Sequence, residues 1–259
     1  MKKLNFLYLF FVLWSSSAQA FQVDQHFFVT IGAFDASRTT FTYKFDKNTY
    51  EITSNVATNG FFNTLYPFQA IYKTFGKIAQ EHLIVQKSNY ESKSRFNTRN
   101  KQIFYTADGK PDHQISTKNG KQKLKNFEQP TEPADTFDLQ TVIAKLTFQY
   151  QHLGFCNSTQ SVFDGKRRFE VIFKDEGEET LLPNEYSAFS GKTARCSFQI
   201  NKENTDEDDT LWQFTAQRPI YFWVARDTKT NHPFIALVKI KDTPLGELTA
   251  YLSKITIKD

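Results

Sequence analysis

Apolar and polar residues alternate along most of the chain, and this is the period of a half-buried β-strand. The clearest run is residues 39–45 (TTFTYKF), which residues 48–53 answer across the polar pair Asp46-Lys47. Pro67 predicts a bend before a further strand. Shorter runs predict strands within residues 21–34, 69–74, 83–90, 92–97, 101–106 and 193–200. The pattern therefore predicts a mainly β protein with an antiparallel meander.

One segment changes to the helical period. Residues 138–150 (DLQTVIAKLTFQY) place apolar side chains three and four positions apart, at Leu139, Val142, Ile143, Leu146 and Tyr150. Asp135 or Asp138 is available as the N-cap, and Gly154 is placed to end the helix. We expect the apolar stripe to pack on the protein's own sheet, and binding to a partner is the alternative.

Two strands are expected directly after the helix, at residues 157–163 and 167–174. Asp164-Gly165 lies between them. We expect these two residues to form a two-residue hairpin turn, because such turns need positive φ at both central positions. Glycine tolerates positive φ freely, and aspartate does so better than most residues.

Three basic residues follow this turn, and they are a candidate anion site. Strand alternation places Arg167 on the face of Phe169, whereas Arg168 points to the opposite face. Lys166, Arg167 and Arg168 are therefore not expected to converge on one ligand. We interpret the stretch from Cys156 to Lys174 as the structural hub of the carboxy-terminal half.

The last segment predicts strands that are covered on both faces. Residues 219–226 (PIYFWVAR) and 233–240 (PFIALVKI) carry large apolar groups in successive positions, and residues 247–257 form a third strand. A sheet that is open to water on one face alternates apolar with polar residues instead. We expect the helix to cover one face and a second layer or a curled sheet to cover the other. The predicted fold class is a curved antiparallel sheet closing into a barrel or half-barrel, with one packed α-helix.

Three charged stretches are expected to be solvated loops. Residues 110–133 are rich in lysine and proline and would connect two halves of a single domain spanning residues 21–259. Lysines without interleaved aromatic residues make a poor nucleic-acid platform, so we expect no nucleic-acid partner. Residues 175–179 (DEGEE) predict a charged turn. Residues 201–210 are acidic, but they lack the ligand spacing and central glycine of a calcium-binding loop.

The amino terminus has the pattern of a signal peptide. Lys2 and Lys3 precede an apolar run at residues 4–14, and residues 15–20 end in the small-residue pattern Ala18-x-Ala20. We expect residues 1–20 to be cleaved after Ala20, and the protein to be exported to the periplasm. An uncleaved membrane anchor is the alternative. No later run is long and apolar enough to span a bilayer.

Composition adds to this picture. The chain has 259 residues, of which 16% are aromatic and 27 are Phe, and this favours strands and a bulky core. Removal of two lysines with the signal peptide leaves 30 basic against 28 acidic residues, a net charge of +2.

Both cysteines lie in the exported part, so pairing of Cys156 with Cys196 is the expected state and a free buried pair is the alternative.

The sequence contains no recognisable catalytic or metal-binding motif. The five histidines are scattered, at His26, His82, His113, His152 and His232. None has another metal ligand at helical spacing, and the cysteines lack the C-x-x-C spacing. There is no nucleophile elbow, no P-loop and no dinucleotide fingerprint. We therefore expect no metal, no cofactor and no enzyme, although folding can always bring two carboxylates together.

The runs CNSTQSVFDGKRRFEVIF, TARCSF and RPIYFWVAR, with HPFIALVKIKDTPLGELTAYL, resemble bacterial exported proteins of domain-of-unknown-function family 3108, in particular its alphaproteobacterial members. The most specific pieces are the two cysteines and a signature hairpin, which consists of Phe163, Asp164, Gly165, Lys166, Arg167, Arg168 and Phe169. The resemblance implies an exported, mostly β protein of unknown activity. It also implies a curved antiparallel sheet like the half-barrels of periplasmic lipoprotein carriers, and it transfers no catalytic residues.

Two functional hypotheses follow. The first is a binding module whose concave sheet holds an apolar ligand such as a lipid or acyl chain, because cavity-forming sheets need few polar groups. Its candidate contact residues are Phe169, Phe198, Phe222 and Trp223. The second is a structural or assembly factor of the cell envelope, which would have a packed core and act through contacts with envelope proteins. An enzyme is the third and weakest hypothesis.

Overall fold

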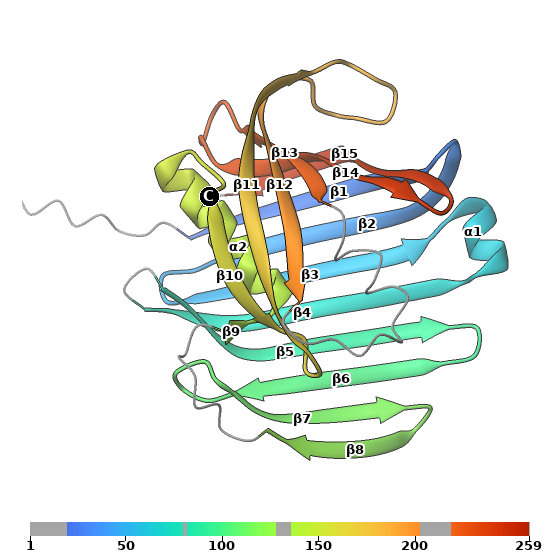
Figure 1. Ribbon diagram of the computed structural model, residues 1–259, viewed down its shortest axis with the longest axis vertical. Coiled ribbons are helices and arrows are strands. Elements are labelled where there is room, and N and C mark those ends of the chain that lie inside the picture. The colour runs from blue at the N-terminus through green and yellow to red at the C-terminus, as the bar shows by residue number, and fades with distance from the viewer. Residues whose placement is uncertain (1–19, 80–81, 128–135, 203–218, 259) are drawn as a thin grey trace, which may run out of the picture.

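The structure is a computed structural model that describes residues 20–79, 82–127, 136–202 and 219–258 (Figure 1). Fifteen strands form one continuous sheet in the order β8-β7-β6-β5-β4-β3-β2-β1-β15-β14-β13-β12-β11-β10-β9. Neighbouring strands are antiparallel, except that β9 and β10 pair in parallel. The mainly β, antiparallel fold class is therefore confirmed.

The amino-terminal half of the sheet is a simple meander. Its strands are β1 (Phe21–Ile31), β2 (Phe34–Phe45), β3 (Thr49–Thr58), β4 (Phe68–Ala79), β5 (His82–Ser94), β6 (Thr98–Tyr105), β7 (Pro111–Lys118) and β8 (Lys121–Asn126). The short helix α1 (Gly60–Leu65) connects β3 to β4, just before the bend expected at Pro67.

The carboxy-terminal half begins with a helix and returns to the sheet. Its elements are β9 (Thr136–Phe137), α2 (Leu139–Leu153), β10 (Ser158–Phe163), β11 (Arg168–Leu181), β12 (Gly191–Lys202), β13 (Ile220–Arg226), β14 (Pro233–Thr243) and β15 (Gly246–Lys258). β15 pairs with β1, so the two halves join through the first and last strands.

The sheet curls around α2 (Figure 1). Strands β10 to β13 cross in front of the amino-terminal strands, and α2 lies between the two layers, in contact with β3, β5, β10 and β14. Val142, Leu146 and Tyr150 of α2 are buried in a core cluster with β10 to β13. Ala144 joins a second cluster with β1 to β3. The concave side of the sheet is therefore occupied by the predicted helix.

The caps of α2 are those that the sequence predicts. The Asp138 carboxylate accepts a hydrogen bond from the Thr141 amide, and this satisfies one of the free N–H groups of the first turn. Gly154 ends the helix in the left-handed conformation, with its amide donating to the Tyr150 carbonyl. Deep in the fold, the Tyr50 and Thr141 hydroxyls are 3.0 Å apart and hold the first turn against β3.

Strands β13 and β14 are covered on both faces, as their apolar pattern predicts. Phe222 and Val224 belong to the cluster around α2. On the other face, the loop between β11 and β12, at residues 182–190, folds back over the sheet. The Phe189 ring meets the Phe234 ring of β14 edge to face with centroids 5.4 Å apart, and the Ala188 amide donates to the Leu252 carbonyl of the neighbouring β15. A loop, rather than a second sheet, is the outer cover.

Three expectations about local structure were wrong. Much of the predicted lysine-rich loop at 110–133 is the hairpin β7–β8, whose tight turn uses Asn119 and Gly120 at positive φ. An exposed edge strand needs only backbone pairing on one side, so it shows no apolar alternation. Residues 175–179 continue β11 as a bulge instead of forming a turn. Residues 83–97 hold one strand instead of two.

Two further predictions lie wholly or mainly outside the described residues. The signal peptide at residues 1–20 reaches into the described chain only at its last residue, and most of the acidic loop at 201–210 is not described. In the part of the chain that the structure does describe, no helix has the length and apolar character needed to cross a bilayer.

Candidate functional site

The expected disulfide is present between Cys156 and Cys196, with 6.2 Å between the two Cα atoms. Both cysteines are fully buried in the cluster around α2. The Cys156 amide also donates to the Asp175 carboxylate. The bridge joins the segment between α2 and β10 to β12, so it fastens the end of the helix to the sheet that surrounds it.

The bridge also decides whether a metal can bind nearby. Cys156, Asp175 and Cys196 are the one group of three candidate metal ligands that comes together among the described residues. Metal binding by cysteine needs the free thiolate, and the disulfide uses both sulfur atoms. One carboxylate remains, and it already accepts a backbone hydrogen bond. This group is therefore structural.

The turn of the signature hairpin differs from the prediction. β10 and β11 pair up to Phe163 and Arg168, so the loop has four residues, 164–167, and not two. The Asp164 carboxylate accepts hydrogen bonds from the amides of Lys166 and Arg167, and from Nε of Arg167. Only Gly165 of the loop has positive φ, +89°. The aspartate side chain, and not a positive φ at Asp164, shapes this turn.

The tip of this hairpin lies against β6 and β7, on the other half of the sheet. Lys101 Nζ donates to the Asp164 carbonyl at 2.5 Å, and the Phe163 and Phe127 rings meet edge to face at 5.0 Å. A side chain on Gly165 would overlap Gln114. The signature hairpin therefore brings together parts of the sheet that no backbone pairing joins among the described residues.

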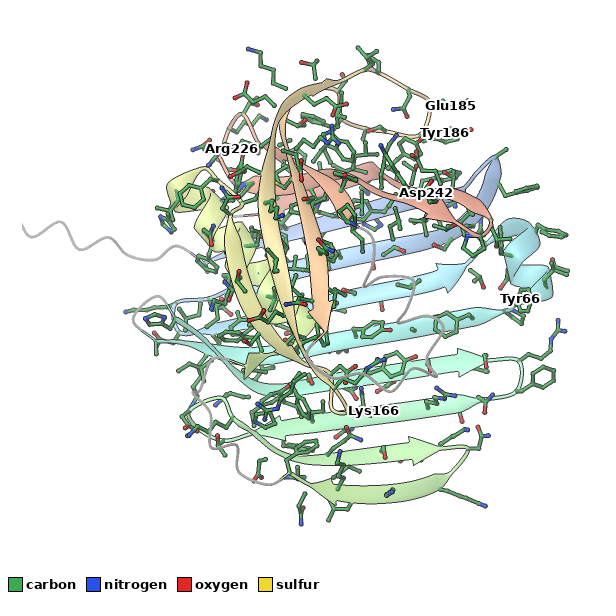
Figure 2. All side chains as sticks on the ribbon, in the orientation of Figure 1. Tyr66, Lys166, Glu185, Tyr186, Arg226 and Asp242 are labelled. Carbon is green, nitrogen blue, oxygen red and sulfur yellow. A yellow bond between two sulfur atoms is a disulfide. The ribbon has the colours of Figure 1, made fainter. Side chains whose placement is uncertain are left out.

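The three basic residues of the hairpin do not form an anion site. Arg167 is paired with Asp164, and the Arg168 guanidinium lies 5.6 Å from the centre of the Phe163 ring. Lys166 projects from the tip (Figure 2). The prediction that these residues diverge agrees with this arrangement, although Arg167 lies in the loop and not on a strand face.

The four candidate ligand contacts separate into two groups. Phe169 and Phe222 are buried in the cluster around α2, and Phe198 packs against it with its ring 6.2 Å from Phe222. The cavity beside Phe222 has a volume of about 20 Å³, which is room for little more than one water molecule. Trp223 points to the opposite face. The concave side is therefore packed where the sequence suggested a ligand.

Asp138 is a buried carboxylate next to this core. Burial raises its pKa, and hydrogen bonds from Thr141 and Thr74 act in the opposite direction. Burial likewise raises the pKa of the nearby Tyr50 and Tyr105. Asp138 and Tyr50 hold the first turn of α2 in place through their hydrogen bonds with Thr141.

A larger cavity lies on the outer face, and we call it the outer cavity. It has a volume of about 260 Å³ and lies between the 182–190 loop and strands β13 to β15. Its apolar walls are Leu181, Leu182, Phe189, Trp223, Leu237 and Tyr251. Trp223 Nε1 donates to the Glu179 carboxylate at 3.0 Å, and this fixes the orientation of the indole. Of the four predicted contact residues, only Trp223 lines this cavity.

Sequence reasoning missed the rest of the outer cavity. Leu181 and Leu182 follow the charged turn expected at residues 175–179, in a stretch for which no element was predicted. The return of the 182–190 loop over β15 depends on contacts such as that of the Tyr186 ring with Tyr251. One sequence signal pointed to this region. Tyr221 and Trp223 make the outer face of β13 apolar, and this predicts that a second layer covers it.

A second groove is more open than the outer cavity. It has a volume of about 310 Å³ and runs over β4 to β7. Glu91, Arg99 and Asn100 are among its lining residues, and Asn100 donates to the Glu91 carboxylate. The outer cavity is the more enclosed of the two, and a ligand site buries most of its ligand's surface.

Comparison with known proteins shows the family of this chain. The model of the family described as "Protein of unknown function (DUF3108)" matches residues 20–253. No curated protein matches the chain. Among solved structures, the chain is similar to a beta-barrel-like protein of domain of unknown function DUF1849 from Brucella abortus, at 8% sequence identity and a TM-score of 0.49, over 92% of this chain and 98% of that one. The family match covers nearly the whole chain, and the protein therefore belongs to the DUF3108 family.

Proposed function

We propose that this protein is an exported, non-catalytic module that binds a small apolar ligand, such as a lipid or acyl chain, in the outer cavity. The observation that carries the proposal is the set of apolar walls around about 260 Å³ of space beside Trp223. Ligand pockets are typically concave, mostly apolar and equipped with a few polar groups that orient the ligand.

The size and lining of the outer cavity narrow the ligand class. Its volume is slightly below the usual range of about 300–1,000 Å³ for small-molecule sites, so a short chain or the end of a longer one fits best. Lys239, Asn184 and Ser187 place polar groups beside the apolar walls. A ligand with an apolar body and one polar end matches this arrangement.

Decanoate is a suitable probe for the proposal. Isothermal titration calorimetry should give saturable binding to the wild-type protein. Leu237→Trp fills the cavity and should weaken binding about tenfold or more. Leu124→Trp is the matched control, because Leu124 is exposed on β8, and this variant should bind as the wild type does. Absence of decanoate uptake, together with a clean apo mass in native mass spectrometry, would refute the proposal, as would unchanged binding by Leu237→Trp.

The second candidate is a structural or assembly factor of the envelope. The packed concave side favours it, because a core filled by α2 needs no ligand. Under this function, cross-linking in cells should capture an envelope protein while decanoate does not bind. The two candidates therefore predict opposite outcomes of the same titration.

Export to the periplasm is part of the proposal. The buried disulfide supports it, because such bonds persist in oxidising compartments. Amino-terminal sequencing of protein recovered from the periplasmic fraction should begin at Phe21. Recovery of the chain in the cytoplasm with Met1 intact would contradict it.

A further inference from the structure

One side of the sheet exposes a row of large apolar side chains, which we call the aromatic rim. It consists of α1 and the turns β1–β2, β5–β6 and β14–β15, which lie together on the right of Figure 1. Six side chains on it are 44–81% exposed: Phe34, Phe61, Leu65, Tyr66, Phe96 and Leu245. Tyr66 projects from the rim beside α1 (Figure 2).

Contacts between the turns make the rim continuous. The Gly32 amide donates to the Glu247 carbonyl, so the β1–β2 and β14–β15 turns touch. The Phe34 and Phe61 rings are 6.3 Å apart, and they link the β1–β2 turn to α1. Arg95 donates to the Thr64 carbonyl at 3.0 Å, and this links α1 to the β5–β6 turn. The exposed side chains therefore belong to one surface.

The opposite side of the sheet has a different composition. Its described hairpin turns are polar, at residues 46–48, 106–110 and 227–232. Exposed apolar side chains occur on that side too, but not on hairpin turns: Leu153 and Phe155 lie at the end of α2, and Phe75 lies within β4. Hairpin turns favour Gly, Asn, Asp and Ser, so turn formation does not explain the phenylalanines of the aromatic rim.

Cations flank the lower part of the rim. Lys93, Arg95, Arg99, Lys118 and Lys121 are all exposed around Phe96. Arg99 and Lys118 are direct cross-strand partners, and like charges in that position oppose each other in the free protein. No ion pair involves these five residues in the described part of the chain. These cations therefore give the rim a positively charged flank that can bind an anionic partner.

We propose that the aromatic rim docks the protein on a membrane surface that contains anionic lipids. The exposed apolar side chains, each on its own turn, insert into the interfacial layer of the membrane. The lysines and arginines beside them bind lipid phosphates. Aromatic residues with flanking Lys and Arg are typical of bilayer interfaces, and basic clusters bind anionic lipid surfaces. A protein partner would instead need a continuous packed face. This docking does not depend on the outer cavity.

Vesicle flotation tests the proposal with the chain that begins at Phe21. Vesicles of phosphatidylcholine with phosphatidylglycerol should carry the wild-type protein, and vesicles of phosphatidylcholine alone should carry much less. Added salt should weaken the binding, because it screens the lipid charge. The triple variant Phe34→Ser, Phe61→Ser, Phe96→Ser should bind about tenfold or more weakly. All three side chains are exposed, so circular dichroism should show an unchanged fold.

The opposite side provides the matched control. Leu153→Ser with Phe155→Ser removes exposed apolar groups as well, but it should leave binding unchanged. Insertion can be read directly: brominated lipid should quench the added fluorescence of Phe96→Trp and not that of Leu153→Trp.

Three results would overturn the proposal. They are no binding of the wild type to either kind of vesicle, wild-type binding by the triple variant, and an equal loss of vesicle binding in the opposite-side variant. A wild-type dimer that the triple variant breaks, with no vesicle binding, would assign the rim to a second copy of the chain instead. Loss of decanoate binding in the outer cavity would leave the docking result untouched.

Discussion

The ammonium group of Lys101 on β6 donates a hydrogen bond to the carbonyl oxygen of Asp164 in the β10–β11 loop. These residues belong to distant parts of the strand order, which the described backbone pairs do not bring back together. Burial lowers the pKa of Lys101, and the Asp164 charge acts in the opposite direction. Side chains at the tip of the signature hairpin therefore hold β10 and β11 against the amino-terminal half of the sheet, although the sheet itself does not close.

Gly165 at this tip should be sensitive to substitution. Gly165→Ala introduces a side chain at φ +89°, and its Cβ would approach Ile103 Cδ1 to 2.8 Å. Positive φ alone costs a non-glycine residue about 1–2 kcal/mol. Displacing Ile103 and Gln114 should add about 1 kcal/mol. Urea unfolding monitored by circular dichroism measures the total.

Gly120→Ala separates these two contributions. Gly120 has φ +81° in the β7–β8 turn, and no atom lies within 4 Å of the position that a Cβ would take. Gly120→Ala should therefore lower the free energy of unfolding only by the cost of positive φ, without the cost of displacing neighbouring side chains. Equal losses at the two glycines would mean that the hairpin tip does not press on β6 and β7.

Asp138 should make stability depend on pH in an unusual direction. Its folded-state pKa is raised, so the folded protein holds this proton more tightly than the unfolded chain does. The contribution of Asp138 is therefore full below the unfolded pKa of 3.8, and it is lost as the pH rises through the folded value. Asp138→Asn keeps an N-cap side chain but removes the titration.

The test of this prediction is the difference in unfolding free energy between Asp138→Asn and the wild type. The stability of the variant relative to the wild type should increase from pH 4 upwards. Asp227→Asn is the control, since backbone hydrogen bonds lower the pKa of that half-buried carboxylate. Its contribution is present above the unfolded pKa of 3.8 and is lost as the pH falls below it, so this variant should not gain relative stability as the pH rises. A pH-independent difference for Asp138→Asn would contradict the prediction.

The disulfide should contribute strongly to stability. The two cysteines are 40 residues apart, and closing a loop of this length stabilises a fold by about 4 kcal/mol on the chain-entropy model. Replacing Cys156 and Cys196 by Ala should lower the melting temperature and remove the effect of a reductant. Thiol titration of the unreduced, denatured wild type should find no free thiol, and two free thiols would refute the bridge.

Arg226 should anchor the end of α2. Its guanidinium donates to the Tyr150 carbonyl at 2.7 Å and lies 5.0 Å from the centre of the Tyr150 ring. Figure 2 labels Arg226. Arg226→Met leaves this carbonyl without its charged donor and should cost about 1–3 kcal/mol in chemical denaturation. Arg95→Met also removes a contact to a carbonyl, but at an exposed site, and should change stability by less than about 0.5 kcal/mol. Equal effects would argue against the anchor.

Local patterns fixed much of the secondary structure. The alternation in β2 and β3, the helical spacing of α2 and its caps at Asp138 and Gly154 all rest on interactions between residues close in sequence. The hairpin β7–β8 was missed because an exposed edge strand is held by backbone pairing and leaves no apolar pattern. The course of β11 past residue 175 was missed because a bulge absorbs the charged residues.

The sequence by itself determined the fold class, the helix, the cysteine pair and the two-sided covering of β13 and β14. Only the tertiary structure decided where the fold leaves a cavity. The apolar residues of a strand look alike whether they face a ligand or a helix, and α2 fills the concave side beside Phe222. The outer cavity at Trp223 and the aromatic rim arise from turns far apart in sequence, which long-range strand pairing brings together.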